Sequence, residues 1–247
     1  MFPFAPKKPP PPPRERLMEV AGRQLPLTVR ENARATRLTL RIAAGGRGLA
    51  VTVPPGTRSG EIDRFVDRHQ GWLEERLKEL PARPMLRPGV KVPIRGVPHL
   101  IAHAPENRGL ATIVAGEKGP EIHVHGERPH LPRRLADYLK REAKKDIGRL
   151  VDKHAAAVGK TVASISFKDT VSRWGSCTAD GKLAFSWRIM MAPPAIIDYL
   201  VAHEVAHLVH MNHGPKFWAL CEKLCPRTKE ARAWLKRNGT ALQAIGF

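Results

Sequence analysis

The stretch YLVAHEVAHLVHMNHGPKFW, from Tyr199 to Trp218, decides the fold of the second half of the chain and raises the first question about its chemistry. It places four histidines and one glutamate among residues that are otherwise mostly apolar. Burying an imidazole costs free energy unless its ring nitrogens find partners. Because one metal ion can partner several imidazoles at once, the stretch predicts a metal site built on a buried helix.

Two of these histidines have the spacing of metal ligands. His203 and His207 are four residues apart, so both imidazoles leave the same face of a helix. Glu204 follows the first histidine and is displaced from it by about 100° around the helix axis. This H-E-x-x-H arrangement is typical of two zinc ligands and a carboxylate that takes a proton from the attacking water.

A third histidine, His213, has to approach the other two through a bend. On an unbroken helix it would lie about 15 Å along the axis from His203, too far to share one ion. The sequence MNHGP at 211–215 contains Asn212, which tolerates a left-handed backbone, and Pro215, which stops a helix. We therefore expect the chain to bend within 211–215 and to bring the three imidazoles together.

Other titratable residues of this region leave alternatives open. His210 lies one turn beyond His207. We expect its side chain to contact one of the metal-ligating residues or to lie at the surface, and it is also an alternative third ligand. Glu222 and Glu230 are alternative third ligands, because some zinc enzymes use a downstream glutamate. The histidines can also be core or surface residues whose ring nitrogens are satisfied by hydrogen bonds.

The chain divides into three predicted parts. Residues 1–18, with five consecutive prolines at 9–13, predict a disordered tail. Residues 19–128 contain short β-branched runs between turn residues, which predict a mostly antiparallel β-rich module with one helix from Ser59 to about Pro81. Residues 129–247 predict an α+β domain that carries the histidines.

Within the last part, the pattern indicates one hairpin and four helices. The hairpin is expected to turn at Asp180-Gly181, with a single strand over 164–177 before the turn. The helices are expected at 133–157, from Pro193 to about Asn212, at about 215–224 and at 227–238.

Composition limits the class of protein. The 247 residues are 42% hydrophobic and 26% charged, which suits a globular chain. No apolar run reaches the roughly 18 residues of a membrane span, and no secretory signal is evident, so we expect a cytoplasmic protein without a membrane partner. The three cysteines do not suggest disulfides, and Cys221 and Cys225 are expected in the core. The oligomeric state is not indicated.

Charge suggests a further class of partner. The chain has 42 Lys and Arg against 23 Asp and Glu, for a formal net charge of +19. Such a surface attracts phosphate-rich molecules, so nucleic acid or a nucleotide is a possible partner. Charge alone does not separate this interpretation from an ordinary solvated basic surface.

Three segments together resemble a known family. They are SRWGSC at 172–177, IIDYLVAHEVAHLVHMNHGPKFW at 196–218 and CPRTKEARAWL at 225–235. They are similar to the YgjP-like, SprT-related zinc metallopeptidases. The resemblance implies an N-terminal β-rich module followed by a zincin-like α+β catalytic domain, with Zn²⁺ as cofactor. It also implies that His203, His207 and His213 are the metal ligands and that Glu204 is the general base.

The SRWGSC segment carries a second candidate catalytic residue. Arg173 can stabilise an oxyanion that develops on a substrate carbonyl beside an edge strand. The alternative is structural, with Trp174 packed on the active-site helix and Gly175 permitting a bulge.

The leading prediction is a zinc-dependent metallopeptidase acting on a protein or peptide substrate. Zinc would polarise the scissile carbonyl, and Glu204 would move the proton. One alternative is a metal-dependent nucleotide phosphohydrolase, which the basic surface favours. Another is a DNA-associated protease of the SprT type, for which steep salt dependence of DNA binding would be expected.

Overall fold

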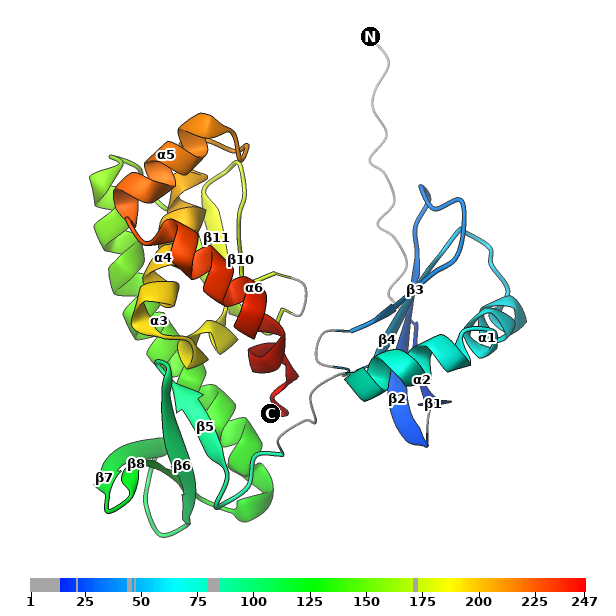
Figure 1. Cartoon of the computed structure of the whole chain (residues 1–247), viewed down its shortest axis with the longest axis horizontal. Helices are drawn as coiled ribbons and strands as arrows, with labels where there is room; N and C mark the ends of the chain where they lie inside the picture. The colour runs from blue at the N-terminus through cyan, green and yellow to red at the C-terminus, as the bar shows by residue number, and fades with distance from the viewer. Residues whose placement is uncertain (1–13, 21, 44–45, 47, 80–84, 171–172) are drawn as a thin grey trace. The chain divides into compact units, whose positions relative to one another are not determined.

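The computed structural model describes residues 14–20, 22–43, 46, 48–79, 85–170 and 173–247 (Figure 1). Its contacts divide the chain into two compact units, Met1–Ala82 and Arg83–Phe247. The proline run at 9–13, predicted as part of a tail, lies outside the described residues. Strand β1 begins at Arg14, before the predicted end of the tail at residue 18, and pairs with its neighbour along its whole length.

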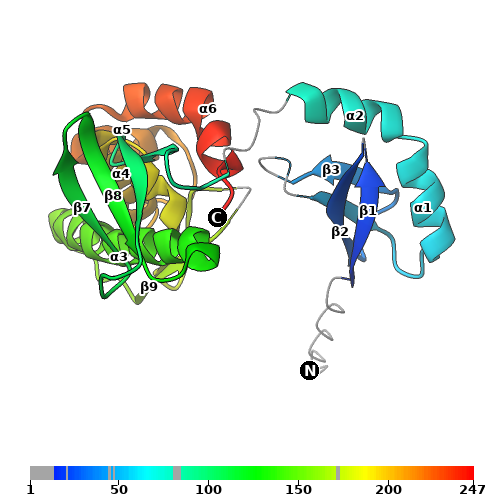
Figure 2. The same cartoon turned by 90° about the horizontal axis from the view of Figure 1, so that it is seen from below.

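The first unit is a four-stranded sheet covered by two helices (Figures 1 and 2). Its strand order is β1-β2-β4-β3, with β2 and β4 parallel, so it is not the simple antiparallel meander that the alternating pattern suggests. Leu27, Val51 and Leu73 have almost no exposed surface and belong to a core confined to this unit. The bounds are β1 Arg14–Val20, β2 Arg23–Glu31, β3 Thr39–Ile42, β4 Leu49–Val53, α1 Ser59–Asp67 and α2 Gln70–Glu79.

The second unit begins with another four-stranded sheet and a long helix. The strand order is β5-β6-β8-β7, with β6 and β8 parallel. Helix α3 packs against β7 and β8 and continues past them to α4 (Figure 1). The bounds are β5 Lys91–Ile94, β6 Val97–Ala104, β7 Ala111–Gly116, β8 Gly119–His125, the 3₁₀ turn η2 Arg128–His130 and α3 Leu131–Ala157.

Arg95 ties this sheet to the rest of the second unit. Its backbone N–H donates to the carbonyl oxygen of Met190 at 2.7 Å. Its side chain donates through Nε to Asp146 at 2.7 Å and through Nη2 to Glu142 at 2.9 Å, both on α3. The apolar side chains of β5–β8 also share one core with α3 and α4. The boundary predicted at residue 128 therefore differs from the division of contacts at 82 and 83.

The remaining elements carry the candidate site. The predicted strand over 164–177 is two strands, β9 and β10, which flank β11 in the order β10-β11-β9. The turn at Asp180-Gly181 joins β10 to β11 in an antiparallel hairpin, as predicted. The bounds are β9 Ser164–Lys168, β10 Gly175–Cys177, β11 Lys182–Ser186, η3 Trp187–Met191, α4 Pro194–Ala206, α5 Pro215–Leu224 and α6 Thr228–Ala244.

Helix α4 is buried along most of its length and is anchored to α3. The Nε2 atom of the buried His154 on α3 lies 2.8 Å from Oδ1 of Asp198 on α4. The helix ends at Ala206 and not near Asn212 as predicted. The backbone N–H groups of Leu208 and Val209 bond three residues back, to Val205 and Ala206, and this tightened turn ends the α-helical pattern.

The fold is thus the predicted α+β class, with a β-rich N-terminal part followed by a half rich in helices. Among the described residues, no helix is both long enough and apolar enough to cross a lipid bilayer. Cys221 and Cys225 are buried and unpaired, as expected for core residues.

Candidate metal centre

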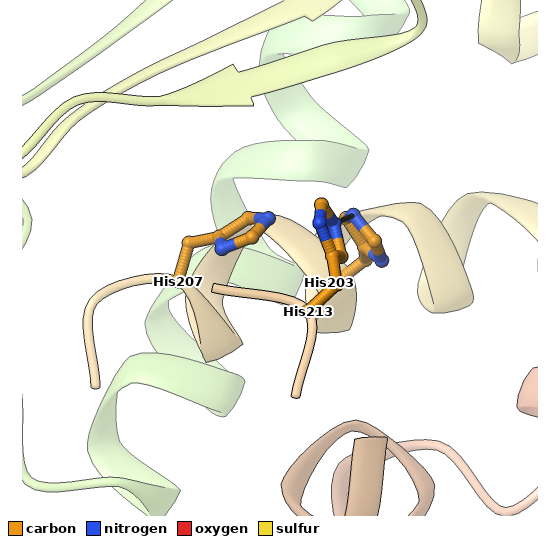
Figure 3. A group of neighbouring side chains, drawn as sticks. All are labelled: His203, His207 and His213. Carbon is orange, nitrogen blue, oxygen red and sulfur yellow. Dashed lines mark hydrogen bonds between the residues drawn. The ribbon is translucent and has the colours of Figure 1, made fainter. Parts of the chain in front are cut away.

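Three imidazoles converge at the end of α4 (Figure 3). His203 lies in the last turn of the helix, His207 is its C-cap, and His213 comes from the loop that leads to α5. One ring nitrogen from each lies within 4.8 Å of the others. The Nε2 atoms of His203 and His213 are 3.2 Å apart. The structure therefore brings together the three histidines that the spacing selected, although the chain turns earlier than predicted.

The second ring nitrogens of two histidines are held in place by their neighbours. Nδ1 of His207 donates to the carbonyl oxygen of His210 at 3.1 Å, which leaves its Nε2 with a free lone pair. Nδ1 of His203 lies 3.4 Å from the hydroxyl oxygen of Tyr199, one turn earlier on α4. Such partners fix the orientation of a ligating imidazole. His210 therefore contributes its backbone carbonyl, and its ring is outside the cluster.

The donor set fits a zinc ion. Zn–N bonds of about 2.0–2.1 Å in a tetrahedron place the ligand nitrogens about 3.3 Å apart, close to the 3.2 Å between His203 and His213. Burial, with smaller contributions from the neighbouring imidazoles and Arg232, lowers the pKa of His203 to about 4. The pKa of His207 is also lowered, chiefly by burial. These rings are therefore neutral near pH 7, as a metal ligand must be.

Two aromatic residues of α5 pack against the imidazoles. The ring of Phe217, which has no exposed surface, has its centroid 5.0 Å from that of His203, 4.5 Å from that of His207 and 4.8 Å from that of His213. The ring of Trp218 stacks on His213 at 5.6 Å. The sequence predicted a helix at this position, but it did not indicate that one phenylalanine contacts all three histidines.

Glu204 is buried between α4 and β10. Its side chain is 4% exposed, and a Cβ atom added to Gly175 would lie 2.5 Å from its Oε1 atom. Only a glycine leaves room for the carboxylate at this point of the strand. Burial raises the pKa of Glu204 to about 7, and the positive charge of Arg173 opposes that rise.

Arg173, Trp174 and Gly175, at and just before β10, differ in their exposure and contacts. Arg173 is exposed, and its carbonyl oxygen accepts a hydrogen bond from Thr170 at 2.7 Å. Trp174 is half-buried and lies close to Gly239 of α6, where an added Cβ would come within 3.1 Å of its Nε1 atom. Gly175 lies inside a regular antiparallel pairing with Phe185 and not in a bulge.

The alternative glutamate ligands lie elsewhere. Glu222 pairs with Lys229 at 3.6 Å, and Glu230 pairs with Arg227 at 2.8 Å. Neither belongs to the group of side chains that can share an ion. Beside the cluster, the loop before α5 forms a hollow of about 550 Å³ whose walls include Val209, Met211 and Phe217.

Comparison with known proteins agrees with this geometry. The model of the YgjP-like metallopeptidase domain matches residues 36–238. The chain belongs to the YgjP-like family. The match includes the triad, Glu204 and the segment around Arg173, and it makes the protein a member of a metallopeptidase family.

Two other comparisons add little. No curated protein is similar enough in sequence to be matched to the chain. Among solved structures, the chain is similar to the metallopeptidase zymogen abylysin of Pyrococcus abyssi. The likeness has 20% identity and a TM-score of 0.33, and it covers 36% of this chain and 93% of that one. A likeness this weak transfers no geometry.

Proposed function

We propose that this member of the YgjP-like family is a zinc-dependent peptidase whose ion is held by His203, His207 and His213. The observation that carries the proposal is the convergence of three imidazole nitrogens within 4.8 Å, together with the burial of Glu204, which directly follows the first of these histidines on α4. Three neutral nitrogens are a common catalytic zinc set, since they leave a coordination position open. The family match supports peptide hydrolysis as the reaction.

Zinc bound there would polarise the scissile carbonyl and make a water molecule more acidic. The carboxylate of Glu204 accepts a proton from the attacking water and then gives it to the nitrogen of the leaving amine. Burial of Glu204 against Gly175 of β10 restricts its rotamers and holds the carboxylate in one position. The guanidinium of Arg173, whose field reaches Glu204, is assigned to stabilise the negative charge that develops on the carbonyl oxygen.

The substrate is proposed to be a protein or peptide in an extended conformation. Strand β10 is at the edge of its sheet, where β11 is its only neighbouring strand among the described residues. An extended peptide can add to such an edge through main-chain hydrogen bonds. Because Gly175 on this strand touches Glu204, a peptide bound along β10 would pass the general base.

The test joins metal analysis to one isosteric substitution. Protein purified without chelator is expected to contain about one zinc per chain by plasma mass spectrometry. Glu204→Gln should keep the zinc and lose about 10²-fold or more in the hydrolysis of casein or a quenched peptide. Glu222→Gln, on the neighbouring helix, is the control and should keep full activity.

Two results would contradict the proposed function. Absence of stoichiometric zinc, or hydrolysis that is unchanged in Glu204→Gln, overturns the proposal. Nucleoside triphosphates are assayed beside the peptides, because the net charge of +19 favours anionic substrates. Cleavage of the triphosphate without cleavage of any peptide would replace the proposed reaction by phosphoanhydride hydrolysis.

A further inference from the structure

A cation lies beside the histidine cluster on the side of α6. The guanidinium carbon of Arg232 is 4.0 Å from the centre of the Trp218 ring. Trp218 in turn stacks on His213 at an interplanar angle of 28°, and its centroid lies 5.8 Å from that of His203. A single aromatic side chain therefore connects Arg232 to the cluster.

The charge of Arg232 is not neutralised by a carboxylate in the described part of the chain. Glu222 and Glu230 are the acidic residues nearest to it in α5 and α6, and each is paired with another cation. The side chain of Arg232 is exposed.

The position on an aromatic ring suits this guanidinium to bind a carboxylate. Stacking occupies one face of the guanidinium plane and leaves the N–H groups in the plane free to donate. Two parallel N–H donors match the two oxygens of a carboxylate, and the ionic hydrogen bonds are stronger than neutral ones. A peptide carbonyl offers one oxygen and no charge, so it competes poorly.

We propose that Arg232 is a specificity-determining residue that binds a carboxylate of the substrate close to the scissile bond. The inference rests on the proposed peptidase function and adds the chemical class that the site prefers. The carboxylate can belong to an Asp or Glu side chain or to the C-terminus of the peptide. Arg173 lies in a different segment, just before β10, and keeps its separate assignment to the carbonyl oxygen.

The experiment measures binding first, so that it does not depend on turnover. Zinc-loaded, full-length Glu204→Gln protein is titrated in a calorimeter with alanine-rich hexapeptides. Each peptide carries one Glu or one Gln at a chosen position, and each is made with a free or an amidated C-terminus. We expect a charged member of one pair to bind about tenfold more tightly than its neutral counterpart. The pair that responds identifies the source of the carboxylate.

Substitutions then assign that preference to one residue. Adding Arg232→Gln should abolish the difference between charged and neutral peptides, and Arg232→Lys should restore part of it because the charge returns without the fork of donors. Arg237→Gln is the matched control, since Arg237 is an exposed arginine on another face of the same helix. It should leave the preference intact.

Three results would overturn the inference. They are equal affinity for charged and neutral peptides at every position, a preference that survives Arg232→Gln, and an equal loss of affinity for all peptides in that variant. The last would show a purely structural role. In the active enzyme the preference should appear in KM more than in kcat. If the wild-type enzyme cleaves no peptide, the proposed function fails, while the calorimetric preference still decides the role of Arg232.

Discussion

The ring of Phe217 stacks on the ring of His207, with their centroids 4.5 Å apart and their planes inclined by 30°. The same phenylalanine meets His203 and His213 edge-on, at interplanar angles of 79° and 74°. Because Phe217 is fully buried, its own position is set by the core of the second unit. The apolar packing of α5 therefore helps to orient three imidazoles that come from two different segments.

Replacing Phe217 by a smaller side chain should weaken the binding of the metal ion. We expect Phe217→Leu to weaken zinc affinity about tenfold, because the support behind all three imidazoles is removed. It should also lower the free energy of unfolding by about 1–2 kcal/mol. Competition with a chromophoric chelator measures the affinity. Leu139→Ala is the control, since it creates a core cavity at a residue of α3, a helix that carries none of the three histidines. Unchanged zinc affinity in Phe217→Leu would refute the supporting role.

Gly175 should be needed for catalysis and not for metal binding. A methyl group there would lie 2.5 Å from Oε1 of Glu204, so Gly175→Ala forces the carboxylate to move. We expect kcat to fall about 100-fold with the zinc content unchanged. Gly148→Ala on α3 is the control, because its added Cβ meets nothing within 4 Å. That substitution should keep activity and raise stability by about 0.5–1 kcal/mol. Loss of zinc from Gly175→Ala would point to a role in folding instead.

The convergence of the three histidines can be predicted from the sequence because the information that determines it is local. The spacing of His203 and His207 places two rings on one helical face whatever the surroundings. The residues after them include Asn212 and Pro215, which predicted a bend before α5. The point at which α4 ends could not be predicted in the same way. After Ala206, the N–H groups of Leu208 and Val209 bond three residues back instead of four, in a stretch that is still apolar in sequence.

Contacts between segments that are distant in the sequence could not be predicted from the sequence pattern. Arg95 has no unusual sequence neighbours, yet it links the β5–β6 turn to α3 and to Met190. This link and the shared core join residues from 85 onward to the second unit, whereas composition placed the break at 128. The parallel pairing of β2 with β4 could not be predicted either, because the alternation of apolar and polar residues along a strand does not identify the strand it pairs with.

Asp198 should stabilise the second unit in a pH-dependent way. Its hydrogen bond with His154 of α3 is the main cause of its lowered pKa. A carboxyl with a lowered pKa stabilises the fold above its unfolded pKa of about 3.9, and this contribution disappears as the pH falls through the folded pKa. Asp198→Asn should therefore lower the free energy of unfolding by about 1–2 kcal/mol at pH 7 and by almost nothing at very low pH.

Urea unfolding of chelator-treated protein at several pH values measures this difference. Tryptophan fluorescence mainly reports the second unit, which contains Trp174, Trp187, Trp218 and Trp234. Asp180→Asn is the control. Its pKa is also lowered, to about 2, by a hydrogen bond with Lys182, but the pair is exposed and contributes little to stability. A destabilisation by Asp198→Asn that is the same at every pH would exclude a contribution from the charge.

His207 and His210 should respond oppositely to substitution by alanine. The Nδ1 atom of His207 donates to the backbone carbonyl of His210, so the imidazole of His210 is not needed for that bond. We expect His210→Ala to keep zinc, because the carbonyl remains. We expect His207→Ala to lose it, because one of three converging nitrogens is removed.

Thermal unfolding with and without zinc separates the two variants. Zinc at about 100 times its Kd should stabilise the wild type and His210→Ala by about 2.7 kcal/mol, and it should not stabilise His207→Ala. Both histidines lie in one short turn, so a general effect of substitution on the loop would appear equally in the two variants. Equal loss of the zinc effect in the two variants would contradict the expectation that the backbone carbonyl of His210 is sufficient, because the site would then also need the His210 side chain.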